Sequence, residues 1–184
     1  MRKNVRKNLL FLVPFAVVFL TFVTMFGVVQ QSLRSGADDP QIQMAEDAAA
    51  QLDNGTPPTR LAMGSVDMSR SLAPYLIIYD ENGAVVAGNG KLDGSVPHVP
   101  IGVLTNAQGK DYHRVTWQPE PGVRQAAVSV AAQKYYVLSG RSLKEVEKRT
   151  QAVFWLTILG LGLSWAAVVG GWLLWMQPKA TQSK

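Results

Sequence analysis

Two long runs without a charged side chain constrain this chain of 184 residues more than any other feature. Residues 9–29 form a run of 21 and residues 152–176 a run of 25. A helix of 21 residues covers about 31 Å, which matches a hydrocarbon core roughly 30 Å thick. The sequence therefore predicts two transmembrane helices that flank a polar segment, residues 30–151.

The basic side chains predict how the chain lies in the membrane. Residues 30–151 carry 12 basic and 13 acidic side chains, so the net charge of +5 arises outside them. Basic residues gather on the cytoplasmic side of a span. Four of them precede the first run, namely Arg2, Lys3, Arg6 and Lys7. The second run taken alone favours the opposite orientation, but the first span usually dominates.

The expected organisation follows from these charges. We expect cytoplasmic tails at residues 1–8 and 177–184, transmembrane helices at 9–29 and 152–176, and an extracytoplasmic domain at 30–151. The lipid bilayer is then one partner. Nucleic acid is not expected as another, because the positive charge does not lie on the folded part. The absence of cysteine excludes disulfides and thiolate metal sites.

The first part of the domain has the pattern of helices. Asp39 before Pro40 is typical of a helix start, with Asp39 as the N-cap. Ile42, Ala45 and Leu52 then recur at helical spacing, which predicts a long N-terminal helix. A second, shorter helix is expected at residues 66–72.

The second part of the domain has the pattern of strands. Apolar, β-prone stretches alternate with turn residues, which predicts a roughly five-stranded antiparallel sheet and an α+β fold. The expected strands are residues 75–79, 84–88, 113–118, 124–131 and 134–139, with a short helical stretch at 101–108. Apolar and polar residues alternate within 124–131, which predicts a sheet with one covered face.

The last helix is expected to join the sheet to the second span. Ser142 and Glu145 have the spacing of a capping box, and no proline or glycine follows before the span. Within the span, small residues recur at helical spacing and favour close packing against another helix. These helix-packing residues are Gly160, Ser164, Ala167 and Gly171.

The order of elements resembles the sensor region of bacterial membrane histidine kinases, which is typically a PAS-like or single-Cache domain. The stretches that carry the resemblance are residues 39–43, 45–48, 115–124, 140–143 and 145–147. The resemblance implies a location in the bacterial cytoplasmic membrane. Residues 177–184 are too few for a HAMP linker and a kinase domain, so we expect a sensor module that stands alone.

The resemblance also implies where a small extracytoplasmic ligand would bind, between the sheet and the elements that cover it. The candidate residues combine aromatic walls with cationic donors: Tyr75, Tyr79, Arg114, Trp117, Arg124 and Tyr135. No catalytic residue, metal site or cofactor is expected, because His98 and His113 are isolated and no nucleophile motif accompanies them.

Two functions remain open from the sequence. The chain is either a sensory module that signals through helix contacts, as a homodimer or with a membrane protein partner, or a structural accessory subunit of a membrane protein complex.

Overall fold

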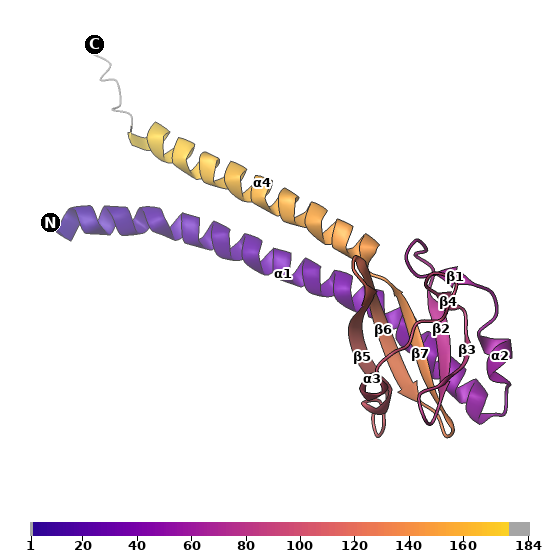
Figure 1. The fold of residues 1–184 in the computed structure, drawn as a ribbon. Coiled ribbons are helices and arrows are strands. Elements are labelled where there is room, and N and C mark those ends of the chain that lie inside the picture. Colours follow the sequence, from indigo (N-terminus) through magenta and orange to yellow (C-terminus); the bar gives the residue numbers. More distant parts are fainter. Residues whose placement is uncertain (1, 177–184) are drawn as a thin grey trace, which may run out of the picture. The chain divides into compact units, whose positions relative to one another are not determined.

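The computed structural model describes the backbone of residues 2–176 and the side chains of residues 12–36 and 38–176 (Figure 1). The described residues divide into two compact units. The helical unit comprises residues 2–32 and 149–176, and the α/β unit comprises Leu33–Lys148. Each unit has its own packing.

Parts of two long helices form the helical unit. Helix α1 is Arg2–Asp53 and helix α4 is Lys144–Met176. Each contains a segment long and apolar enough to cross a membrane, with mean hydropathy of 2.5 and 2.0. Length and composition are therefore as expected for residues 9–29 and 152–176.

A five-stranded antiparallel sheet in the order β3-β2-β7-β6-β5 forms the centre of the α/β unit. Its strands are β2 (Tyr75–Asp80), β3 (Val85–Gly88), β5 (His113–Glu120), β6 (Val123–Ala131) and β7 (Tyr135–Ser142). A parallel pair, β1 (Val66–Asp67) with β4 (Gly90–Lys91), lies outside this sheet. The short helices are α2 (Pro58–Leu61) and α3 (Ile101–Thr105). The predicted α+β class, long N-terminal helix and antiparallel sheet are confirmed.

Both faces of the sheet are buried. On one face, the C-terminal part of α1 packs through Ala45, Ala48, Ala49 and Leu52. Their partners on the strands are Leu76, Ile78, Val128, Val130 and Val137. We call this the helix-covered face. On the opposite, loop-covered face, Met68, Leu92, Val99 and Leu104 cover inward residues of β2, β6 and β7.

The expectation of a single covered face was wrong, and β6 shows why. Six consecutive residues of this strand are buried, including the polar Gln125 and Ser129. Both have partners in the segments that cover this face of the sheet. Gln125 Nε2 donates to Met68 O at 3.0 Å, and Ser129 Oγ donates to Val103 O at 2.9 Å. These polar residues are buried with hydrogen-bond partners. Their alternation with apolar residues in the sequence therefore resembled that of a strand with one solvent-exposed face.

The predicted helix start at Asp39 was also wrong, because α1 continues through Asp39 and Pro40 without a break. Proline removes one backbone donor from a helix interior. Here the helix persists because its next turns are buried against the sheet, beginning at Gln41. Packing thus outweighs the local stop signal.

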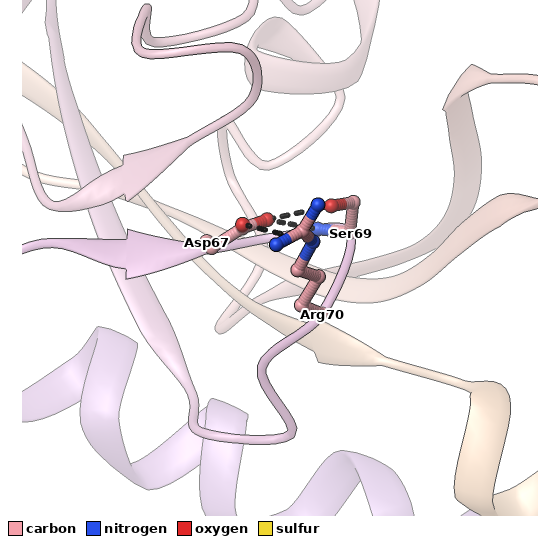
Figure 2. A network of polar contacts seen from close by, with 3 residues as sticks. All are labelled: Asp67, Ser69 and Arg70. Atoms are coloured by element: carbon pink, nitrogen blue, oxygen red, sulfur yellow. Dashed lines mark hydrogen bonds and ion pairs between the residues drawn. The ribbon is translucent and has the colours of Figure 1, made fainter.

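The helix expected at residues 66–72 is absent from the described structure, where β1 and a turn occupy this stretch. Asp67 Oδ1 accepts hydrogen bonds from the backbone N–H and the hydroxyl of Ser69, at 2.9 and 2.7 Å (Figure 2). Arg70 Nε lies 4.0 Å from the other carboxylate oxygen. An aspartate that bonds two residues ahead favours a turn over a helix.

The remaining boundaries agree with the sequence. The five predicted strands and the helical stretch after Pro100 are present, with ends shifted by a few residues. Helix α4 begins at Lys144, and Leu143 O accepts its first intrahelical bond from the Glu147 N–H, so the N-cap position is one residue later than the predicted Ser142. The Ser142 hydroxyl still accepts a hydrogen bond from the Lys144 N–H at 3.3 Å. The predicted unbroken course from this cap to residue 176 is confirmed.

Candidate functional site

Three of the predicted ligand residues lie on the loop-covered face. Tyr75 and Tyr79 extend from β2 and have no exposed surface, and Trp117 packs against the same cluster from β5. Tyr75 lies across two glycines. A Cβ at Gly90 would come within 2.6 Å of its ring, and a Cβ at Gly140 would collide with its hydroxyl. These two glycines therefore make the space that the Tyr75 ring fills.

The polar atoms of these aromatic residues are enclosed without hydrogen bonds. The hydroxyls of Tyr75 and Tyr79 and Nε1 of Trp117 are buried and have no partner. Burial raises the pKa of both tyrosines well above the usual value. The Trp117 indole lies close enough to offset part of the pKa rise at Tyr75, although the two groups do not reach hydrogen-bond geometry. The cluster could donate to a small polar ligand only if the covering loops opened.

The three other predicted ligand residues lie elsewhere. Arg114 faces α1, with its guanidinium 4.0 Å from Asp38 and 3.9 Å from Asp39, and it also lies 5.2 Å from the ring centre of Tyr112. Arg124 pairs with Glu147 of α4 at 2.5 Å. Tyr135 borders a cavity of about 290 Å³ at the C-terminal end of α1. The structure thus does not bring the six residues into one site.

The environment of Asp38 shows how closely α1 approaches the sheet. Burial raises the pKa of this carboxyl, and the neighbouring Asp39 adds to the rise, while Arg114 and Arg34 act against it. Asp38 is therefore a partly buried carboxylate whose main cationic partner is Arg114. It links α1 to the edge strand β5.

The helix-covered face also encloses polar groups that reasoning from the sequence did not identify. Gln41 of α1 and Ser139 of β7 are fully buried, and neither the amide atoms of Gln41 nor the hydroxyl of Ser139 has a hydrogen-bond partner. Nε of Arg141, two residues further along β7, is also buried and unpartnered. A lone glutamine, serine and arginine form no recognisable motif, so the sequence carries no signal for them.

The helix-packing residues divide into two pairs. A Cβ at Gly160 would lie 2.7 Å from the Phe22 ring of α1, so this glycine receives an aromatic side chain of the same chain. Ser164 is half-buried and donates to Gly160 O at 2.8 Å. Ala167 and Gly171 are exposed, and nothing lies within 4 Å of a Cβ at Gly171. Half of the stripe therefore packs within the chain and half faces outward.

Aromatic rings extend the contact between the two helices of the helical unit. Phe15 and Phe19 lie 5.9 and 6.4 Å from Trp165, and Phe26 lies 6.0 Å from Phe154. Residues later in α1 contact residues earlier in α4, so the two helices pack antiparallel.

Prediction: the loop-covered face makes the α/β unit sensitive to alkali. Above pH 10 the unfolded chain releases the protons of Tyr75 and Tyr79, whereas the folded chain keeps them because their pKa is raised. The free energy of unfolding of fragment 33–148 should then fall by about 1.4 kcal/mol per pH unit for each tyrosine. Urea unfolding at a series of pH values, with circular dichroism as the signal, measures this slope.

Tyr75→Phe removes one of the two titrating hydroxyls, so the slope should fall by the contribution of one tyrosine. The free energy of unfolding at neutral pH should stay unchanged or rise slightly, because the substitution removes an unpartnered buried hydroxyl. Tyr135→Phe, at a half-buried ring on the other face, is the matched control. A Tyr75→Phe fragment that keeps the full slope would contradict the burial of this hydroxyl.

Comparison with known proteins adds no relative to this picture. No known protein family, curated protein or solved structure matches the chain.

Proposed function

We propose that this chain is a membrane-anchored, non-catalytic sensory module whose α/β unit lies outside the cytoplasm. One observation carries the proposal: both ends of the α/β unit continue directly into the apolar helices. Helix α1 has no break between Arg2 and Asp53, and α4 begins at Lys144, just after β7 ends at Ser142. A change inside the unit therefore has a short covalent route to both apolar helices.

The topology belongs to the same proposal. Residues 9–29 and 152–176 are taken as the spans, and both termini as cytoplasmic, in a bacterial cytoplasmic membrane. The apolar windows and the basic residues before the first span support this orientation. The long helix and the five-stranded antiparallel sheet are also compatible with a PAS-like or Cache-like sensor domain.

The route for a signal starts at the central strand. Strand β7 pairs with β2 on one side and β6 on the other, and it leads into α4. In the helical unit, Phe22 against Gly160 couples α4 to α1. The exposed Ala167 and Gly171 leave the later part of the same stripe on α4 for a partner helix, from another copy or another protein.

A structural accessory subunit is the second candidate, and the same exposed pair favours it. Small residues that face outward also suit permanent packing against the helices of a larger complex. The two candidates differ in whether the partner stays attached and in whether a ligand changes the protein.

Prediction: a reporter that is active only outside the cytoplasm should be active when fused at Gly90 and silent when fused after Lys184. The physical reason is the cluster of basic residues before the first span. The same two fusions in a variant with Arg2, Lys3, Arg6 and Lys7 replaced by glutamine test that reason. Activity only at the C-terminal fusion of the unmodified chain would show that the charges before the second span set the orientation.

Prediction: purification in a mild detergent separates the two functions. A sensory module should elute as a small homo-oligomer or with a partner that salt or a small molecule releases. Leucine at Ala167 should weaken this association because it blocks close helix approach, whereas leucine at Gly162, which is exposed and outside the stripe, is the control. A large complex of fixed stoichiometry that no small molecule alters would favour the accessory subunit.

A further inference from the structure

Asparagine followed by glycine is the dipeptide in which an asparagine side chain most readily converts to an acid. The backbone nitrogen of the glycine attacks the side-chain amide carbon, and a glycine, which has no Cβ, leaves this attack unhindered. The sequence does not distinguish one such pair from another, but the structure gives each pair different surroundings. The chain contains three of them, namely Asn54-Gly55, Asn82-Gly83 and Asn89-Gly90.

The pair Asn89-Gly90 is enclosed by the fold. Asn89 is buried, its Oδ1 accepts a hydrogen bond from the Leu76 N–H at 2.7 Å, and its Nδ2 donates to Met63 O at 3.2 Å. A Cβ at Gly90 would lie 2.6 Å from the Tyr75 ring, so the surroundings of this glycine are already filled. Attack at this site therefore requires the surrounding strands to unfold.

The pair Asn82-Gly83 lies in the turn between β2 and β3, which several hydrogen bonds hold. The Asp80 carboxylate accepts from the N–H groups of Asn82 and Ala84 at 2.9 and 2.8 Å. The Gly83 N–H, which would supply the attacking nitrogen, donates to Asp80 O at 3.0 Å. Gly83 is also buried, and a Cβ there would lie 2.6 Å from Cδ1 of Ile101. Attack at this site requires the whole turn to break.

The pair Asn54-Gly55 lies at the C-terminal end of α1, and both residues are exposed. The Gly55 N–H donates to Leu52 O at 2.9 Å. The Thr56 N–H donates to Gln51 O, also at 2.9 Å, and together these bonds form a Schellman ending. Nothing lies within 4 Å of a Cβ at Gly55, so the attack has free space. The end of a helix opens at a lower free energy than a core strand.

We propose that Asn54 is the principal deamidation site of the folded chain. The Gly55 nitrogen loses its proton and attacks Cγ of Asn54, and the new C–N bond closes a cyclic succinimide. The bond from Cγ to the side-chain nitrogen breaks, and this nitrogen leaves as ammonia with the proton that the backbone lost. Water then opens the ring at either carbonyl, which gives aspartate or isoaspartate at position 54. The reaction consumes water, releases ammonia and involves no change of oxidation state.

The product weakens the contact between the end of α1 and the start of β7. A carboxylate at position 54 lies at a helix C-terminus, where the helix dipole disfavours negative charge. It also adjoins Asp53, whose carboxylate accepts from the Gln133 N–H at 2.9 Å. An isoaspartate additionally lengthens the backbone by a methylene group inside the Schellman ending. This inference goes beyond the sensory function proposed above and does not depend on it.

Prediction: when the full-length chain is incubated in detergent at mildly alkaline pH, Asn54 should convert first, as measured by mass spectrometry of its peptides. Conversion at Asn82 should be at least about tenfold slower, because more hydrogen bonds must break there, and conversion at Asn89 should be slower still. The same chain in urea is the control. Unfolding removes the structural differences, so the three pairs should then react at similar rates.

Two substitutions test the consequence of the reaction. Asn54→Asp should lower the thermal unfolding midpoint of the full-length chain by about 1–4 °C, because it places the charge at the helix end. Asn54→Gln, which adds no charge, is the matched control and should change the midpoint less. The proposal is overturned if Asn82 or Asn89 reacts faster than Asn54 in the folded chain. It is also overturned if Asn54 stays intact in the folded chain while the chain in urea deamidates.

Discussion

The packing of α1 on the sheet is the contact on which the rest of the α/β unit depends. Ala45, Ala48 and Ala49 have short side chains, so the helix axis can lie close to strands β2, β6 and β7. Leu52 anchors its end, and burial of one such leucine contributes about 1.5–3 kcal/mol. This contact keeps α1 helical through Pro40 and makes the apolar helix and the core helix a single element.

The same contact also encloses polar groups between α1 and the sheet. We call Ala45, Ala48 and Ala49 the alanine seam. Because alanine side chains are short and do not interlock with the strands, this seam tolerates small displacements of the helix better than large side chains would. At one end of the seam lie Gln41 and Ser139 without partners, and the ion pair between Asp38 and Arg114 lies beside them. Two buried polar groups without partners make this end of the contact less favourable than the alanine seam.

Local chemistry made the strands and turns predictable. Asp80 shows this well, because its carboxylate accepts from the N–H groups of Asn82 and Ala84 at 2.9 and 2.8 Å, all within one turn that the sequence displays. The start of α1 was not predictable in this way, because the signal at Asp39 is local whereas the packing that overrides it is not. The second covered face was hidden because the partners of Gln125 and Ser129, Met68 and Val103, are distant in sequence.

The candidate ligand residues were only partly predictable for a related reason. Arg114 and Trp117 are three positions apart on one strand, so alternation places them on opposite faces, which the sequence alone could have shown. Ser139 shares a row with Val128 and Arg114 only through the register of the strands. No spacing in the sequence carries that information.

Amide hydrogen exchange across residues 30–45 of the full-length chain in lipid nanodiscs tests the central claim most directly. One continuous helix predicts slow exchange through this segment, without a gap of rapidly exchanging amides around Gly36 and Asp39. Rapid exchange confined to residues 34–40, between protected segments on both sides, would show two separate helices. The apolar helix would then lack the direct connection to the sheet on which the proposed signalling depends.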